Sequence, residues 1–366
     1  MGTDLAEVDT PALVLDLDAY GRNLDRMAAL AASTRVALRP HAKMHKSPLV
    51  TLDQVARGAV GACVQKVAEA EVLVRGGVED VLVSNEVVGG PKVDRLAALA
   101  RQARIGVCVD DAAQVEALST AATEHGVELR VLVEVDVGAG RCGVVPGPDA
   151  VRLGAQVGSA PGLVLDGLQG YHGTAQHLRT HDERAAAVTS AADLLRSTMR
   201  LFDEAGLPHA VVSGGGTGTA DIDVTTRVWT ELQVGSYAFM DADYARNLGG
   251  DGMPVHAYEQ ALFVLTTVMS QARTGVAVID AGLKALAVDS GLPLVHDRPG
   301  VEYVGASDEH GTLSVAPGVD APRLGERLLL VPGHCDPTVD RFDWYVGVRS
   351  GRVESVWPVA ARGAMH

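Results

Sequence analysis

The sequence predicts an α/β protein in which a (β/α)8 barrel is followed by a mostly antiparallel β domain. Three observations carry this prediction. The chain has 366 residues, which is enough for two domains at about 150 residues each. From residue 35 to about residue 240, short β-branched runs alternate with segments of helical period, the pattern of βα units on a parallel sheet. After about residue 255, strand-like runs follow one another with short turns.

The elements expected first along the chain are a strand at residues 12–15 and a helix at about residues 18–31. Asp18 is the residue that we expect to cap the N-terminus of this helix. We place the barrel at residues 18–250 and the β domain at residues 1–17 together with residues 251–366.

Eight strands are predicted in the barrel region, which fits a closed barrel better than an open sheet of about five or six strands. Their ranges are 35–38, 60–64, 81–84, 105–109, 129–135, 165–170, 210–213 and 236–240. The strands predicted for the β domain are 262–269, 275–279, 292–295, 302–304, 313–315, 327–331, 344–348 and 353–359.

The composition excludes several classes of protein and partner. Apolar residues make up 47% and charged residues 21% of the chain, which rules out intrinsic disorder. The 31 basic and 46 acidic side chains give a formal charge of −15, which repels nucleic acid and anionic membranes. No apolar run approaches the roughly 18 residues of a membrane span, and the first residues do not resemble a signal peptide, so we expect a cytoplasmic protein. Four well-separated cysteines predict neither a disulfide framework nor a cysteine zinc site.

Lysine is rare in this chain, which makes each lysine a candidate for chemistry. Only five of the 31 basic residues are lysines, and a lysine can lose its proton and act as a nucleophile whereas an arginine stays protonated. Lys43 and Lys46 lie in the segment RPHAKMHKS, directly after the first predicted barrel strand. A lysine at this strand end is a candidate for a Schiff base, because burial lowers the pKa of an amine. A solvated basic loop is the alternative interpretation.

A phosphate site is suggested by the run SGGGTGT at residues 213–219 and by Gly235 and Ser236, which follow or lie at the seventh and eighth predicted strands. Barrels commonly bind phosphate at these two loops, where glycines let backbone N–H groups approach closely. A flexible turn also explains a glycine run. A strand-end lysine and a phosphate cradle together suggest pyridoxal phosphate.

Further candidates lie at the ends of the second, fifth and sixth predicted strands. Arg141, in the turn EVDVGAGRCG, can reach a cofactor ring or form a structural ion pair. Tyr171, in the loop GYHGTAQH, can support the ring, and His172 or His177 can serve as a general base. Gln65 can reach the ring with its amide, although an ordinary loop glutamine is the alternative.

A metal pair is predicted in the segment VPGHCDP of the β domain. His334 and Asp336 are two residues apart, so on an extended segment their side chains point to the same side. An imidazole with a carboxylate oxygen suits Mg²⁺ or Mn²⁺. A turn before Pro337 is the alternative.

Six motifs, in the same order along the chain, resemble the D-threonine aldolase and D-serine dehydratase family of fold-type III pyridoxal phosphate enzymes. The resemblance extends from about Thr10 to Val359, and its motifs are RPHAKMHKS, EVDVGAGRCGV, GYHGTAQH, SGGGTGT, LQVGSYAFMDADY and HCDPTVD. The sequence ELQVG before Ser236 lacks the arginine with which alanine racemase faces the pyridine nitrogen, so a racemase is not expected.

The resemblance implies a role for each candidate residue. Lys43 would form the Schiff base with pyridoxal phosphate, and Lys46 would be dispensable for it. Arg141 and Tyr171 would contact the cofactor, and the phosphate would lie near Ser213, Gly214, Gly235 and Ser236. His334 and Asp336 would bind the metal, and an Asp at the second position favours the aldolase branch. The family also implies a homodimer.

The predicted function is therefore an aldolase that depends on pyridoxal phosphate and a divalent metal and cleaves D-3-hydroxy-amino acids to glycine and an aldehyde, with His177 as the general base. A D-serine or 3-hydroxyaspartate dehydratase and a D-3-hydroxyaspartate aldolase are alternatives on the same scaffold. A non-catalytic pyridoxal phosphate carrier and a metallohydrolase that uses His41, His45 and His334 are alternatives from other classes.

Overall fold

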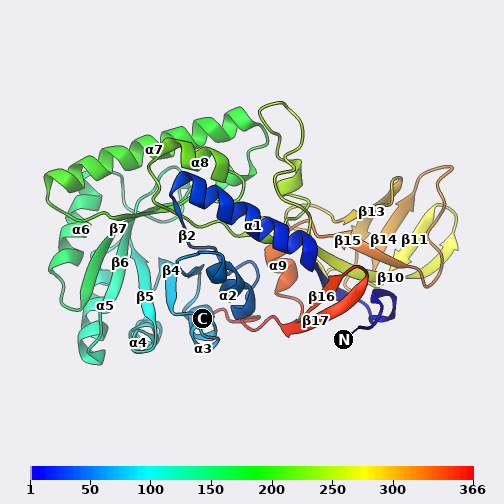
Figure 1. Ribbon diagram of the computed structural model, residues 1–366, viewed down its shortest axis with the longest axis horizontal. Coiled ribbons are helices and arrows are strands. Elements are labelled where there is room, and N and C mark those ends of the chain that lie inside the picture. The colour runs from blue at the N-terminus through cyan, green and yellow to red at the C-terminus, as the bar shows by residue number, and fades with distance from the viewer. Residues whose placement is uncertain (1) are drawn as a thin grey trace.

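The computed structural model describes residues 2–366 and contains a closed parallel sheet and a second, mostly antiparallel sheet (Figure 1). The parallel sheet has eight strands in the order β2-β9-β8-β7-β6-β5-β4-β3. Backbone hydrogen bonds from Cys63 to Pro40 and from Ala42 to Cys63 close it between β2 and β3. Its strands are β2 (Ala37–Leu38), β3 (Ala62–Val64), β4 (Asp80–Glu86), β5 (Arg104–Val109), β6 (Leu129–Glu134), β7 (Leu163–Gly170), β8 (Val211–Gly214) and β9 (Glu231–Leu232). The predicted (β/α)8 barrel is confirmed.

Helices lie outside the barrel strands and cover them (Figure 1). α1 (Leu17–Thr34) precedes β2, and it buries Leu24, Met27 and Ala31, whose spacing places them on one face. The others are α2 (Pro48–Ala56), α3 (Val67–Arg75), α4 (Gly90–Leu99), α5 (Ala112–His125), α6 (Pro148–Ser159), α7 (His181–Glu204) and α8 (Ala220–Thr226). The cap of α1 was predicted wrongly, because Asp16 and not Asp18 accepts the backbone N–H groups of the first turn.

The eighth barrel strand also differs from the prediction. Residues 236–240 were expected to form it, but the strand is β9, and Ser236–Ala238 form a 3-10 helix. The error has a physical cause. The strand carries Glu231 and is followed by Gln233, and both polar side chains are buried inside the barrel, so the segment lacks the apolar run that identified the other strands.

The second sheet has nine strands, and the N-terminal strand β1 (Ala12–Asp16) is one of them. β1 pairs with β10 in antiparallel and with β16 in parallel orientation. The further strands are β10 (Leu262–Arg273), β11 (Val276–Ile279), β12 (Leu294–Val295), β13 (Val301–Ala306), β14 (Gly311–Val315), β15 (Arg327–Val331), β16 (Trp344–Arg349) and β17 (Arg352–Pro358). The mostly antiparallel second sheet is confirmed, whereas the exact domain boundaries stay a prediction.

A short helix, α9 (Cys335–Val339), interrupts this sheet after β15. The prediction that His334 to Asp336 are extended is therefore wrong beyond His334, which is extended and lies directly before the helix. Pro337 in the first turn is compatible with a helix start because a proline lacks the N–H that this position cannot use. The Asp336 side chain therefore projects from the first turn of a helix and not from the end of a strand.

The interior of the barrel changes from ion pairs at one end to hydrogen-bonding groups at the other. Near the first residues of the strands, Arg39 pairs with Glu231 at 2.9 Å and with Asp80 at 2.6 Å, and Arg130 pairs with Asp80 at 2.5 Å. A buried apolar cluster follows, made of Cys63, Leu82, Cys108 and Leu132. Polar side chains lie toward the last residues of the strands, among them the buried Gln169, Ser213 and Glu134. The barrel therefore presents its chemistry at the carboxyl ends of its strands, as is usual for this fold.

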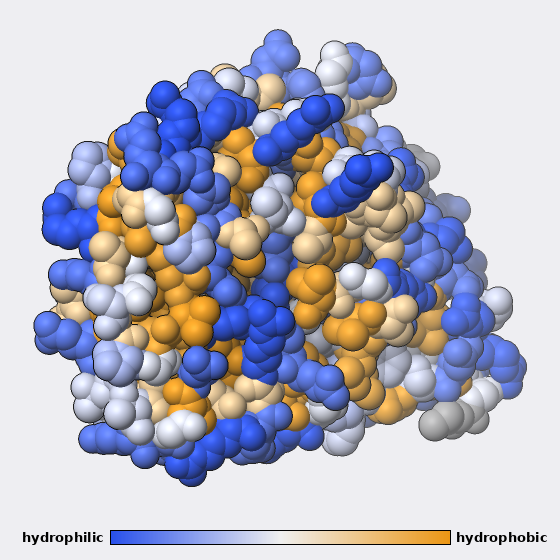
Figure 2. Space-filling view, turned by 60° about the vertical axis from the view of Figure 1, so that its left-hand side comes forward, coloured by the Kyte–Doolittle hydropathy of each residue, from blue (hydrophilic) through white to orange (hydrophobic). Residues whose placement is uncertain are grey.

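The surface of the barrel side mixes both kinds of side chain. Hydrophilic side chains form most of the rim in Figure 2, and apolar side chains gather in several areas toward the middle. Among residues 2–366, no helix is both long and apolar enough to cross a membrane.

Lys46 joins the barrel to the second domain, which corrects the interpretation of its segment as a solvated loop. Its ammonium is buried and lies 2.7 Å from Glu69 and 3.5 Å from Asp340. Nearby, the Tyr345 hydroxyl of β16 donates to the His45 carbonyl at 2.6 Å. Residues 45–48 are buried.

We predict that Lys46→Ala lowers the free energy of unfolding by about 3–5 kcal/mol, because it leaves the buried Glu69 carboxylate without its partner. Chemical denaturation followed by circular dichroism measures the change. Lys284→Ala is the matched control, since Lys284 pairs with Glu309 in an exposed position and its loss should change stability little. Equal stabilities of the two variants would contradict the prediction.

Candidate active site

A cavity of about 560 Å³ lies at the carboxyl ends of the barrel strands. This volume is in the range of small-molecule sites. Seven of the residues predicted for the site line it, namely Lys43, Gln65, Arg141, Tyr171, His177, Gly235 and Ser236. Five loops of the barrel, which follow β2, β3, β6, β7 and β9, thus meet at one cavity.

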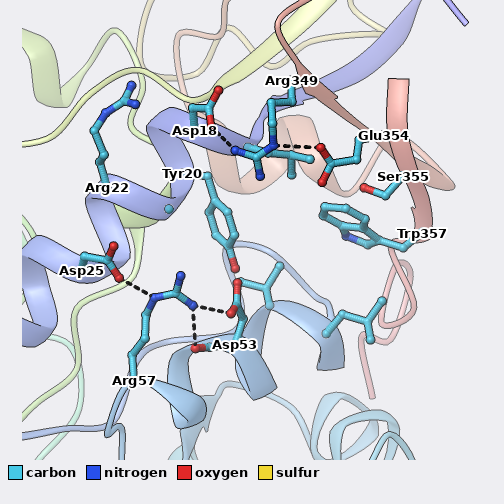
Figure 3. A pocket seen from close by; sticks show the side chains of 14 residues that line it. Asp18, Tyr20, Arg22, Asp25, Asp53, Arg57, Arg349, Glu354, Ser355 and Trp357 are labelled. Atoms are coloured by element: carbon cyan, nitrogen blue, oxygen red, sulfur yellow. Dashed lines mark hydrogen bonds and ion pairs between the residues drawn. The ribbon is translucent and has the colours of Figure 1, made fainter. Parts of the chain in front are cut away.

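A second cavity of about 560 Å³ lies between α1, α2 and the β16–β17 hairpin. Figure 3 shows Arg57 between Asp25 and Asp53, and Arg349 between Asp18 and Glu354. The residues that line it within the described chain include no lysine, histidine or cysteine. Because the charges of the second cavity are paired and it has neither the lysine nor the histidine of the predicted site, the barrel cavity is the candidate active site.

Lys43 connects the cavity to the second domain. It follows β2 and its ammonium donates a short hydrogen bond to Asp336 in α9. Burial alone would lower the pKa of the Lys43 ammonium, but the Asp336 carboxylate outweighs burial and raises this pKa above its ordinary value. The same contact outweighs burial at the carboxyl group and lowers the pKa of Asp336 to about 2. The expectation that burial lowers the pKa of Lys43 is therefore wrong, because the sequence did not reveal the carboxylate beside it.

His334 lies beside Asp336 and is held from its other side. The His334 Nε2 atom is 4.0 Å from the Asp336 Oδ1 atom. The His334 Nδ1 atom is 2.7 Å from Asp289 and 3.3 Å from the Ser290 hydroxyl. Asp289 was not found by the sequence analysis, because it lies 45 residues before His334 in a loop without a recognisable motif.

His177 is half-exposed to the cavity, and a buried carboxylate holds it. Its Nδ1 atom is 2.5 Å from Asp243. The guanidinium groups of Arg179 and Arg246 also bond to Asp243. These hydrogen bonds outweigh burial and lower the pKa of Asp243, so this carboxyl group stays ionised. Asp243 lies in the motif DADY, and only its position behind His177 reveals its role.

The glycine run after β8 reaches the cavity with Gly216 and Thr217. Ser213 and Gly214 do not line it. Ser213 is fully buried, and its hydroxyl donates to Glu231 at 2.7 Å. Gly214 lies in the barrel wall, where an added Cβ would lie 2.2 Å from the Gly170 carbonyl oxygen.

Two side chains that the sequence analysis missed fix the glycine run from behind. Gln176 accepts from the Gly218 N–H at 2.9 Å and donates to Thr219 at 2.9 Å. Asp223 accepts from the Thr219 hydroxyl at 2.7 Å and from the Gly216 N–H at 3.3 Å. The run is therefore an ordered loop and not a flexible turn.

The opposite wall of the cavity contains the groups expected near a cofactor ring. The Arg141 guanidinium lies 5.8 Å from the centre of the Tyr171 ring and 3.8 Å from Glu134. Gln65 donates to the Ser84 carbonyl at 3.3 Å and lies 2.9 Å from His41. Burial lowers the pKa of His41 well below its ordinary value, so this imidazole is neutral.

A chain of amides, also missed from the sequence, orients one more cavity residue. Gln169 donates to Glu134 at 3.1 Å, and its oxygen accepts from Gln233 at 2.7 Å. The same Gln233 nitrogen donates to Ser213 at 2.8 Å. Both hydrogens of the Gln233 amide group are thus used inside the barrel, which leaves its oxygen for the cavity.

Ligand-type side chains also gather at a place that was not predicted. Within residues 2–366, ligand atoms of Glu86, Asp110 and Cys142 lie within 4.8 Å of one another. His41, His45 and His334 do not form such a group in this part of the chain, and His45 is fully buried. The geometry therefore gives no support to the metallohydrolase alternative.

The cavity fits pyridoxal phosphate. The Lys43 amine lines the cavity, and so do Thr217, Gly235 and Ser236, whose backbone N–H groups have no hydrogen-bond partner among the described residues. Free N–H groups beside glycines are the usual cradle of a phosphate. Lys43 and this cradle are the two attachments that the cofactor requires.

Comparisons with known proteins agree with this geometry. Residues 15–243 match the family model of the alanine racemase N-terminal domain, and residues 261–348 match that of a putative serine dehydratase domain. The chain is 47% identical to a 3-hydroxy-D-aspartate aldolase from Paracoccus denitrificans (strain Pd 1222), over 99% of this chain and 94% of that one. It is 48% identical to a D-threonine aldolase from an Arthrobacter species, over 99% and 95% of the two chains.

A solved structure has nearly the same fold. The D-threonine aldolase from Filomicrobium marinum superimposes with a TM-score of 0.97 and 52% identity, over 100% of this chain and 98% of that chain. A D-threo-3-hydroxyaspartate dehydratase from a Delftia species is less similar, at 32% identity over 98% of both chains.

The Asp223 carboxyl group should make the stability depend on pH. Burial raises its pKa to about 7 from an ordinary value of 3.8. Between these values the folded protein holds a proton that the unfolded chain has lost, so stability falls as pH rises from about 4 to about 7. At about 1.4 kcal/mol for each pKa unit, the loss is on the order of 4 kcal/mol.

Asp223→Asn should remove this pH dependence. We expect the cofactor-free parent to lose more stability than the variant between pH 5 and pH 8, as measured by chemical denaturation at both pH values. Parallel losses in the two proteins would contradict the assignment.

Proposed function

This chain belongs to the family of D-threonine aldolases and 3-hydroxy-D-aspartate aldolases, and from that premise we propose that it cleaves D-3-hydroxy-amino acids to glycine and an aldehyde with pyridoxal phosphate as cofactor. One observation carries the proposal. An amine, a carboxylate-held imidazole and a candidate phosphate cradle line one cavity, and Asp336 of the hard-ligand pair contacts the amine. Each of these groups has a separate task in the cleavage of a Cα–Cβ bond beside a hydroxyl group.

Binding and orientation fall to the barrel. Lys43 would attach the cofactor covalently, and the N–H groups of Thr217, Gly235 and Ser236 would hold its phosphate. Arg141, Tyr171 and Gln65 contact its ring. When bound, pyridoxal phosphate supplies the electron sink that accepts the electrons of the broken bond.

His177 removes the proton from the substrate hydroxyl. Its Nδ1 atom faces Asp243, so the neutral imidazole carries its proton on Nδ1 and directs the basic Nε2 atom away from Asp243. The Tyr244 ring packs at 5.3 Å from the His177 ring and restricts its motion. Retro-aldol cleavage requires a proton to leave this hydroxyl, whereas dehydration requires one to be delivered to it. A base held in this way supports the aldolase over the dehydratase.

His334 and Asp336 hold a divalent cation, for which we propose Mn²⁺ or Mg²⁺. Carboxylate and imidazole ligands suit both ions, and water or substrate completes the coordination. These two residues would hold the cation, which would supply Lewis acidity for the substrate hydroxyl. Asp336 also bonds to Lys43, so the cation would lie next to the point of cofactor attachment.

We also propose a homodimer in the cytoplasm. The charge of −15 supports a location away from anionic membranes. The homodimer is proposed from the resemblance of the six motifs to their family. The mass of the protein in solution tests the dimer.

The proposed activity is tested with the purified holoenzyme and four substrates, D-threonine, D-phenylserine, D-3-hydroxyaspartate and D-serine. We expect glycine and the matching aldehyde from at least one 3-hydroxy substrate, loss of turnover after exhaustive chelation, and its return with Mn²⁺ or Mg²⁺. Lys43→Ala should lose cofactor attachment and turnover, whereas Lys92→Ala, at an exposed lysine, should keep both. Formation of 2-oxo acids from the 3-hydroxy substrates would identify a dehydratase, and bound cofactor without turnover would identify a carrier.

His177→Ala should lower kcat by about 10²–10⁴-fold, the usual contribution of a general base, with the cofactor absorbance unchanged. Asp243→Ala should also lower kcat, because the His177 Nδ1 atom then has no carboxylate to hold its proton and fix the ring. His209→Ala is the matched control, since His209 forms a similar pair with Asp203 at 2.8 Å on the surface. Near-normal cleavage by the His177 variant would move the base to another group.

A further inference from the structure

We infer that Asp289 is a positioning residue that makes His334 a metal ligand through its Nε2 atom. The inference rests on the proposed metal site. The Asp289 Oδ2 atom lies 2.7 Å from the His334 Nδ1 atom, whereas the opposite ring nitrogen, Nε2, is the one near Asp336. Asp289 and Asp336 thus lie on opposite sides of one imidazole.

The hydrogen bond decides which nitrogen can bind a cation. A neutral imidazole carries one proton, and a carboxylate at Nδ1 keeps the proton on that atom. The lone pair is then on Nε2, on the side of Asp336. Metal-binding histidines commonly donate their second N–H to a carboxylate, which fixes the ring and makes the ligand more basic.

The loop that carries Asp289 is built against the His334 segment. The Ala287 N–H donates to the Thr338 hydroxyl at 3.1 Å, and this hydroxyl donates to the His334 carbonyl at 2.7 Å. Gly333, directly before His334, lets the His334 segment lie close to this loop, since a Cβ added to Gly333 would lie 2.0 Å from the Gly291 carbonyl oxygen. The loop is therefore fixed on both sides of Asp289.

Arg246 ties the same loop to the base. Its guanidinium donates to the Ser290 carbonyl at 2.5 Å and also bonds to Asp243, which holds His177. Arg246 thus connects the loop that holds His334 to the carboxylate that holds His177. This connection fixes the position of the proposed metal ligand relative to the proposed base.

The test measures Mn²⁺ binding by the holoenzyme after exhaustive chelation and removal of the chelator. Isothermal titration and the electron paramagnetic resonance signal of free Mn²⁺ both report the affinity without turnover. We expect Asp289→Ala to bind Mn²⁺ about 10–100-fold more weakly than the parent, with unchanged cofactor absorbance. Asp289→Asn should retain most of the affinity, because its amide oxygen can still accept from Nδ1.

Asp297→Ala is the matched control, since Asp297 lies 3.1 Å from His296 in an exposed pair of the same domain. Its affinity should equal that of the parent. Parent-like affinity in Asp289→Ala would overturn the inference, and so would an Asn variant as weak as the Ala variant, because charge and not orientation would then be the cause. A parent that binds no Mn²⁺ would instead refute the proposed metal site.

Discussion

Closure of the parallel sheet is the constraint on which the rest of this molecule depends. Eight parallel strands must all end at the same rim, so loops that are far apart in sequence meet there. The hydrogen bonds that close the sheet join Cys63 to Pro40 and to Ala42. Pro40 and Ala42 lie directly before Lys43 in the sequence. The bonds that complete the barrel therefore also place the amine of the candidate site.

The second sheet brings acidic and imidazole groups to this rim. Asp336 reaches Lys43 from α9, and His334 and Asp289 lie beside it. Two imidazoles, His177 and His334, are each held by a carboxylate, one from each side of the cavity. A barrel without the second sheet would lack Asp289, His334 and Asp336, and with them the proposed metal ligands and their support.

Buried acids inside the barrel also orient neutral groups. Glu134 and Glu231 accept from Gln169 and Ser213, and these two in turn fix the amide of Gln233. Burial raises the pKa of Glu134 to about 8, so this carboxyl group gains or loses its proton near neutral pH. Such groups cost stability, but they hold the wall of the cavity in one arrangement.

The sequence by itself determined the fold class, sixteen of the predicted strand positions in the two sheets, and the lysine, glycine and histidine motifs of the rim, because periodicity and local composition are properties of neighbouring residues. It missed the eighth barrel strand, whose buried Glu231 and Gln233 interrupt the apolar pattern. Only the tertiary structure decided that Asp336 raises the pKa of Lys43, and that Asp243 and Asp289 hold the two histidines. Each of these partners is separated from the group it holds by tens to hundreds of residues. Charge and hydrogen bonding act over a few ångströms in space, and folding alone decides which distant residues come that close.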